Sequence, residues 1–179
     1  ADAPGTLPNV VDLYQREASG WKMKQRFEPR CPDLHGSYSN ATHSAFGCAD
    51  GVLIIRQNGA QFIASKIANP PGMPANARIG TLTGHPKLAT FVGLASPGHV
   101  FEVDPAHASI TPVAWAQGRT RRAHSFDRAG RYFVLLDDTG TTHWLDSSAN
   151  WRVAKTLPVV SRMPAAAPFP SLMPSRSRD

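Results

Sequence analysis

The amino-acid sequence predicts an all-β protein built from repeated four-stranded antiparallel sheets. Helical periodicity is almost absent, and 16 prolines and 14 glycines interrupt the 179 residues too often for long helices. Short runs of β-branched and aromatic residues alternate with turns instead. One hairpin pattern recurs every 39 to 42 residues, which is the repeat length of propeller blades. The expected fold class is therefore a β-propeller, of which this chain forms an incomplete portion.

Three segments carry this repeat. Each contains four mostly apolar residues, a polar link that ends in glycine, and a second strand; the segments are 52–65 (VLIIRQNGAQFIAS), 91–104 (FVGLASPGHVFEVD) and 133–146 (FVLLDDTGTTHWLD). The linking glycines are Gly59, Gly98 and Gly140, which lie 39 and 42 residues apart. Glycine suits these links because a tight hairpin turn requires positive φ.

The repeat divides residues 1–179, taken as part of a single propeller domain, into blades. Residues 8–30 are expected to form the outer two strands of a preceding blade, and residues 161–179 the start of a following one. Three full blades are expected between them, at 31–75, 76–116 and 117–160. Because a closed propeller has about four to eight blades, we expect the remaining blades to come from the rest of the protein or from a companion chain.

Charge and composition narrow the classes of partner. The 19 Lys and Arg exceed the 13 Asp and Glu, and the excess is concentrated at 118–124 and 174–179. Neither cluster is interleaved with aromatic residues, so no nucleic-acid partner is expected. No apolar run approaches the roughly 18 residues of a membrane span. The first residues, ADAPG, have no charged or apolar signal region, so we expect either a removed secretory signal or a cut end.

The two cysteines, Cys31 and Cys48, exclude a tetrathiolate zinc site by their number. A single disulfide in an oxidising compartment is the favoured interpretation. Two buried free thiols in a cytosolic protein are the alternative. A disulfide here would tie the loop that contains His35 to the strand that carries His43, and would so determine where His35 points.

Three histidines share a position relative to the repeat. His43 and His124 each lie nine residues before the hairpins at 52 and 133, and His85 lies six residues before the hairpin at 91. We expect each of them at the head of an innermost strand, facing the central channel. The fourth candidate, His35, lies in the loop that leads into the strand of His43.

A set of three or four imidazoles on a rigid scaffold is typical of a Zn²⁺ site, although copper and nickel accept the same ligands. The alternative is structural, because inner-strand histidines of propellers also hydrogen-bond neighbouring blades. We interpret His99, His107 and His143 as surface or packing residues, and Asp137 and Asp138 as a solvated turn. Asp127 is expected to be a turn residue rather than a further ligand.

No catalytic motif accompanies these residues. The sequence contains no GxSxG, HExxH, GxGxxG or phosphate-binding loop, and we expect a binding protein that is not an enzyme. A propeller enzyme of the lactonase type would carry Asp, Glu and Asn where this chain carries histidines.

Four segments resemble the AztD family of periplasmic zinc metallochaperones: CPDLHG (31–36), AFGCADGVLII (45–55), TGHPK (83–87) and RRAHSFD (121–127). The resemblance extends over most of residues 8–160. It implies a β-propeller with a Cys31–Cys48 disulfide, and zinc held by histidines. It makes His35, His85 and His124 candidate ligands, whereas His43 is supported by its position in the blade. Family members are longer than this chain.

The resemblance also implies a function. A member of this family would hold Zn²⁺ in the periplasm and hand it to the zinc-specific solute-binding protein of an ABC importer, an AztC-like partner. Associative ligand exchange would carry the transfer, with the loop residue His35 releasing first. The alternative function is a propeller that serves as a protein-interaction module, with structural histidines and no metal.

Overall fold

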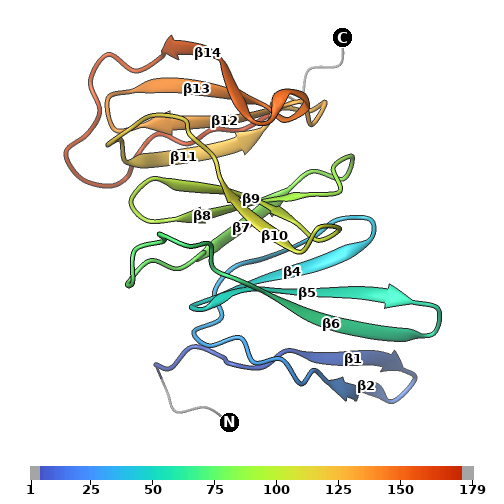
Figure 1. Ribbon diagram of the computed structural model, residues 1–179. Coiled ribbons are helices and arrows are strands. Elements are labelled where there is room, and N and C mark those ends of the chain that lie inside the picture. Colours follow the sequence, from blue (N-terminus) through green and yellow to red (C-terminus); the bar gives the residue numbers. More distant parts are fainter. Residues whose placement is uncertain (1–4, 175–179) are drawn as a thin grey trace.

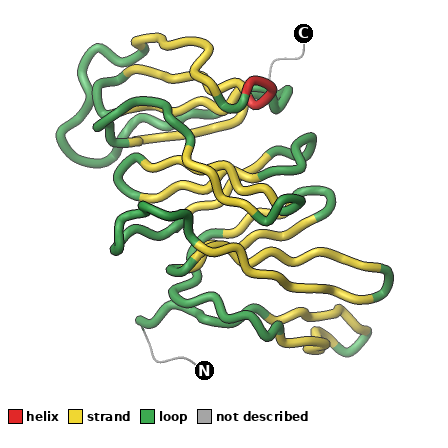
Figure 2. Tube along the Cα trace, viewed as in Figure 1, coloured by secondary structure: helices red, strands yellow, loops and turns green. Residues whose placement is uncertain are grey.

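The computed structural model describes residues 5–174, and it confirms an all-β, incomplete β-propeller. Figure 1 shows four sheets stacked along the chain, from the N-terminal pair of strands to the C-terminal blade. The first sheet has two strands, β1 (Asp12–Glu17) and β2 (Gly20–Arg26). The only helix described is the short 3-10 turn at Ser147–Ala149, which is the red segment in Figure 2.

Three four-stranded sheets follow the first pair. The first full blade contains β3 (Ser37–Ser39), β4 (His43–Cys48), β5 (Gly51–Asn58) and β6 (Gln61–Ala68). The second contains β7 (Thr81–Gly84), β8 (Phe91–Ala95), β9 (His99–Asp104) and β10 (Ser109–Pro112). The third contains β11 (Arg121–Phe126), β12 (Tyr132–Asp137), β13 (Thr141–Asp146) and β14 (Arg152–Pro158).

Within each blade the strands pair antiparallel in chain order. The first and second blades meet strand by strand, since β3 lies against β7 and the fourth strands β6 and β10 also touch. The first strands of these two blades are therefore neighbours, as inner strands around a propeller axis are.

Buried apolar side chains fill the space between successive sheets. Ile54, Ile79 and Phe91 belong to the cluster between the first and second blades, and Leu94 and Phe133 to the cluster between the second and third. The central strands β5, β8 and β12 contain continuous apolar runs because both of their faces are covered. This packing holds the ends of the inner strands, where the candidate histidines lie, in constant positions.

The alignment of the three hairpins is wrong by one strand in the first blade. Segment 52–65 forms the third and fourth strands, β5 and β6, whereas 91–104 and 133–146 form second and third strands. The reason is the inner strand β3, which has only three residues, Ser-Tyr-Ser, and no apolar run. As a consequence, His43 opens the second strand of its blade and not the innermost one.

The hairpin glycines are needed for two different reasons. Gly59 and Gly140 have positive φ, of 61° and 88°, as the turn argument predicts. Gly98 is not among the residues with positive φ. A Cβ at Gly98 would instead overlap the carbonyl oxygen of Arg119, so this glycine permits two backbone segments to approach each other.

The ends of the chain contribute fewer strands. Strands β1 and β2 lie within the segment predicted to hold two outer strands. Residues 159–174 contain no strand, and residues 175–179 lie outside the described part, so a further blade beginning at 161 stays a prediction. In this last segment Phe169 packs under the guanidinium of Arg122, 4.3 Å from its ring centroid. No helix between residues 5 and 174 has the length and apolarity of a membrane span.

Candidate functional site

The candidate residues lie at the two opposite ends of the inner strands. His35, Arg78 and Arg121 come just before or at the start of β3, β7 and β11, and we call this the entry end. His85 and Asp127 directly follow β7 and β11, at the exit end. Because each residue of a strand advances about 3.3 Å, the four residues of β7 alone separate the two ends by about 13 Å.

His35 is exposed at the entry end, and its ring is oriented by the backbone. Its Nδ1 lies 2.6 Å from the carbonyl oxygen of Gly80, which can only accept a hydrogen bond. Nδ1 is therefore the protonated nitrogen, and Nε2 carries the lone pair when the ring is neutral. A ring whose second nitrogen donates to a carbonyl is the usual arrangement of a metal-binding histidine.

The disulfide holds the loop of His35 in place. Cys31 and Cys48 are fully buried and bonded, which confirms the disulfide interpretation. Beside it, the His35 backbone N–H donates to the Gly47 carbonyl at 3.0 Å, and the Gly47 N–H donates to Gly36 at 3.0 Å. A Cβ at Gly47 would overlap the Ile79 carbonyl of the next blade, so this contact requires glycine.

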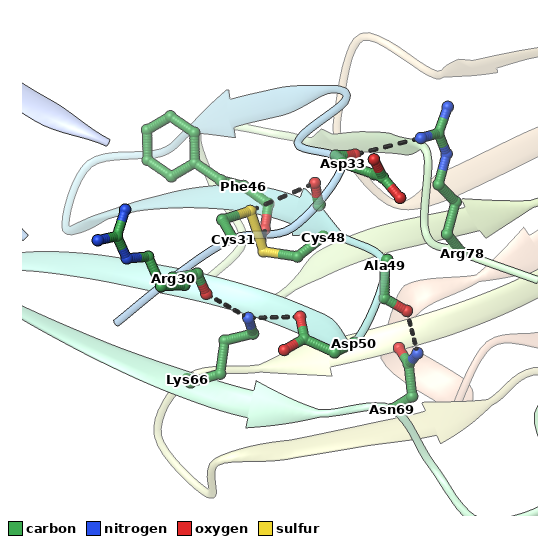
Figure 3. The surroundings of a disulfide bond; sticks show 11 residues. Arg30, Cys31, Asp33, Phe46, Cys48, Ala49, Asp50, Lys66, Asn69 and Arg78 are labelled. Atoms are coloured by element: carbon green, nitrogen blue, oxygen red, sulfur yellow. Dashed lines mark hydrogen bonds and ion pairs between the residues drawn. A yellow bond between two sulfur atoms is a disulfide. The ribbon is translucent and has the colours of Figure 1, made fainter. Parts of the chain in front are cut away.

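Arg78, which lies before β7 of the second blade, also holds the loop of His35. Figure 3 shows its guanidinium reaching the backbone of Asp33, where Nη1 donates to the carbonyl oxygen at 3.2 Å. A Cβ at Gly80 would lie 3.6 Å from Arg78 Nε and 3.9 Å from His35 Nδ1. The guanidinium and the imidazole thus flank one small patch of backbone.

His124 lies within the inner strand β11 and hydrogen-bonds to arginine. A β-bulge between Arg121 and Ala123 shifts the register, and it allows side chains three residues apart to meet, which a regular strand would send to opposite faces. Nη1 of Arg121 donates to Nδ1 of His124 at 3.2 Å. The neutral ring therefore carries its proton on Nε2 and offers no free lone pair while this bond is made.

Burial, and then the charge of Arg121, lower the pKa of His124 to about 4. The pKa of His124 in the folded protein lies below the unfolded value of about 6.5. Its contribution to the free energy of unfolding is therefore fully present above pH 6.5 and is lost as the pH falls towards 4. We expect wild-type protein to lose roughly 3 kcal/mol of unfolding free energy over this window, and His124→Gln, which keeps an acceptor for Arg121, to lose much less. Urea denaturation at pH 7, 5.5 and 4 measures the difference.

His107 provides the control for this experiment. It is exposed, and its hydrogen bond and ion pair with Asp104 raise its pKa. Its stabilising contribution has the opposite pH dependence, being lost as the pH rises. If His107→Gln flattened the acid slope as much as His124→Gln does, burial of His124 would not be the cause of the slope.

His85 and His124 line one hollow at the exit end, of about 570 Å³, together with Asp127. The Lys87 backbone N–H donates to His85 Nδ1 at 3.3 Å, so this nitrogen also acts as an acceptor. Asp127 uses Oδ1 to accept the Tyr132 N–H at 2.8 Å, as a turn residue does.

His43 lies at the exit end of the first blade, where β3 turns into β4. Its Nδ1 lies 2.8 Å from the Thr42 hydroxyl. Burial, and then the charge of Arg56, lower the pKa of His43. Its contacts tie it to its own turn, since its backbone N–H also donates to Asn40 Oδ1 at 2.9 Å.

The four predicted ligands therefore do not form one site in this chain. Between residues 5 and 174, no group of three or more His, Cys, Asp or Glu side chains could hold a metal ion. The structure brings His85 and His124 to one hollow, and it places His35 at the other end of the inner strands. The prediction that three histidines each head an innermost strand is wrong: His43 opens β4, His85 follows the end of β7, and His124 is the fourth residue of β11. For His43 the cause is the alignment, which was displaced by one strand in the first blade.

Two sets of residues escaped the sequence-based interpretation. Asp137 was expected in a solvated turn, and this is wrong: it is 2% exposed, and its Oδ2 accepts a hydrogen bond from Nε2 of buried His143 at 2.9 Å. Arg78 and Arg121 at the entry end were also missed. A basic residue lies just before or at the start of two consecutive inner strands, β7 and β11. This pattern would have indicated both arginines if the register of β3 had been known.

Comparison with known structures is consistent with this architecture. No protein-family model and no curated protein sequence matches the chain. Solved structures place it in the β-propeller class, including the C-terminal WD40 domain of Sif2, with a TM-score of 0.53 and 9% identity over 86% of this chain and 41% of that one.

Within this class the chain is similar to AztD from Citrobacter koseri. Apo AztD superposes with a TM-score of 0.74 and 20% identity, over 92% of this chain and 43% of AztD. A crystal structure of the same protein gives a TM-score of 0.67 and 18% identity, over 86% of this chain and 44% of that one. The chain thus has an AztD-like propeller fold and spans less than half of the AztD length.

Proposed function

We propose that this chain is part of a periplasmic β-propeller that carries Zn²⁺ as cargo and hands it to the solute-binding protein of a zinc ABC importer. The AztD-like fold and the resemblance of four sequence segments to the AztD family support this proposal. The buried disulfide also supports it, because disulfides persist in oxidising compartments such as the periplasm.

The observation that carries the proposal is the orientation of His35. Its Nδ1–H bond to Gly80 leaves Nε2 exposed and free to bind a metal ion. The remaining ligands would come from the blades that this chain does not contain or from the partner, since the described residues offer no cluster of three.

The surroundings of His35 favour release. Arg78 and Arg121 line the same pocket, and their positive charge opposes a divalent cation nearby. An exposed ligand beside two guanidinium groups is the one most easily exchanged for a ligand of an acceptor protein. His35 would therefore be the first ligand to leave during transfer.

The contacts of His124 favour a structural role for this candidate histidine and not metal binding. Its Nδ1 accepts from Arg121, which is the arrangement of a structural histidine and not of a metal ligand. We therefore assign it a positioning role within the channel wall. If every candidate histidine behaved in this way, the chain would serve as a protein-interaction module without metal.

The test is a competition titration with a zinc chelator on the complete propeller. We expect His35→Ala to weaken zinc binding at least tenfold, as loss of a ligand costs no less than loss of its supporting hydrogen bond, and to change the rate of transfer to the solute-binding protein. His107→Ala, an exposed histidine on an outer turn, is the matched control and should match wild type. Equal zinc affinity of wild type and His35→Ala would contradict the proposal.

A further inference from the structure

We propose that the pocket at the entry end binds a small oxyanion, of the phosphate or carboxylate class. This pocket has a volume of about 290 Å³ and is lined by charged and polar residues of two blade junctions, among them His35, Asn76, Arg78, Thr81, Ser96 and Arg121. The volume lies at the lower limit of small-molecule pockets, so the site suits a compact anion rather than a cofactor.

Two guanidinium groups without carboxylate partners make the pocket positive. Among residues 5–174, the ion pairs of the structure include neither Arg78 nor Arg121. Arg78 has a backbone carbonyl as its partner, and Arg121 has the neutral ring of His124. Neither of these acceptors neutralises the charge.

Of the two arginines, Arg121 indicates a ligand more strongly than Arg78 does. Its Nε is buried and has no hydrogen-bond partner among the described residues. Buried charged groups are normally paired, because removing a cation from water without a counter-charge is costly. An anion in the pocket would supply the counter-charge that Arg121 lacks.

The chemistry of the lining residues fits an oxyanion. Arginine presents several N–H donors in a planar fork, which matches two oxygens of a phosphate or carboxylate group. Arg78 lies in the loop before β7 and Arg121 at the start of β11, so the two arginines line the pocket from different blades. Side chains of Asn76, Thr81 and Ser96 add neutral hydrogen-bonding groups.

The experiment is a calorimetric titration of the complete propeller with inorganic phosphate and, separately, with succinate. Ionic strength is held constant, and a chelator keeps zinc out, so the outcome does not depend on the proposed zinc function. We expect one saturable site for at least one of the two probes. Tighter phosphate binding would assign an inorganic oxyanion, and tighter succinate binding a carboxylate.

Two variants test the location of the site. Arg78→Gln should weaken binding at least tenfold, because hydrogen bonds to charged groups are the strong ones. Arg119→Gln removes an equal charge from an exposed arginine that lines a different hollow, and it should change binding less than twofold.

Gly80→Ala probes the pocket without removing charge. The added methyl group would make only ordinary contacts with Arg78 and His35, so the fold should persist, and it would occupy the patch between them and weaken binding several-fold. Absence of saturable binding for both probes would overturn the proposal. An equal loss of binding in Arg78→Gln and Arg119→Gln would also overturn it, because it would indicate a general effect of charge.

Discussion

Replacing Cys31 and Cys48 together by alanine is expected to lower the free energy of unfolding by about 3 kcal/mol. The disulfide closes a loop between residues 17 apart in sequence, and its main effect is to restrict the unfolded chain. Both residues are completely buried, in the cluster between the β1–β2 sheet and the first blade. Urea denaturation of the double variant and of wild type, without reductant, measures the difference.

Reduced wild-type protein separates the cross-link from the packing of the sulfur atoms. Reduction opens the loop but keeps both side chains in place, whereas the double variant also removes their volume. We expect reduced wild type to lose most of the 3 kcal/mol and the double variant to lose slightly more. A double variant as stable as oxidised wild type would show that the hydrogen bonds between the loop and β4 suffice to hold it.

The same change has a functional consequence. The disulfide and the backbone bonds of His35 and Gly47 anchor the loop on β4. Loss of the cross-link should let His35 leave Gly80, and zinc binding should weaken together with stability. The disulfide therefore links the stability of this loop to the orientation of the proposed ligand.

The propeller fold could be predicted from the sequence because its signals are local. Each blade needs apolar central strands and tight links, and both recur in the three hairpins, although the first hairpin is displaced by one strand. Position within the blade could not be predicted in the first repeat. Strand β3 is recognisable only by its pairing with β4 and its contact with β7, and its three residues carry no apolar pattern.

The candidate site could be predicted only in part, for a related reason. A histidine is suited to a metal when its second nitrogen donates to an acceptor, and that acceptor comes from a distant segment. For His35 it is Gly80, whereas the corresponding nitrogen of His124 meets Arg121. Spacing in the sequence cannot distinguish these two cases, because both depend on packing between loops and on a bulge.

Asp137 shows the same limit for a structural residue. The pair Asp137–Asp138 follows an apolar strand and precedes Thr-Gly, which is a common pattern of a solvated turn. The structure turns Asp137 inward, where it accepts hydrogen bonds from Thr139, Thr141 and His143. Trp115 of the preceding inter-blade segment packs edge-on against His143, at 5.1 Å between ring centroids, so the buried pair contacts the neighbouring blade.

Asp137→Ala is expected to lower the free energy of unfolding by about 3 kcal/mol, because it leaves buried His143 and the part-buried turn donors of Thr139 and Thr141 without an acceptor. Asp137→Asn keeps an acceptor for the turn and should cost about 1 kcal/mol. Asp138→Ala is the matched control: Asp138 is half-buried and accepts a single long bond from Thr120 N, at 3.3 Å. Chemical denaturation at pH 7 compares the three variants, and an equal cost for Asp137→Ala and Asp138→Ala would contradict the assigned role.

The pH dependence of the stability difference between wild type and Asp137→Ala tests whether the ionised carboxylate causes it. Burial opposes ionisation of Asp137, but the hydrogen bonds from Thr139, His143 and Thr141 outweigh it and lower the pKa to about 2. Because the unfolded value is about 3.9, the stabilisation is complete above pH 4 and is lost as the pH falls towards 2. The stability curves of wild type and Asp137→Ala should therefore converge across this window.

Asp146, whose pKa is also lowered to about 2, by Arg131 and Ser148, is present in both proteins and cancels from the difference. The effect of His124 falls at higher pH, between about 6.5 and 4, so a gap that stayed constant down to pH 2 would exclude the ionised carboxylate as its cause.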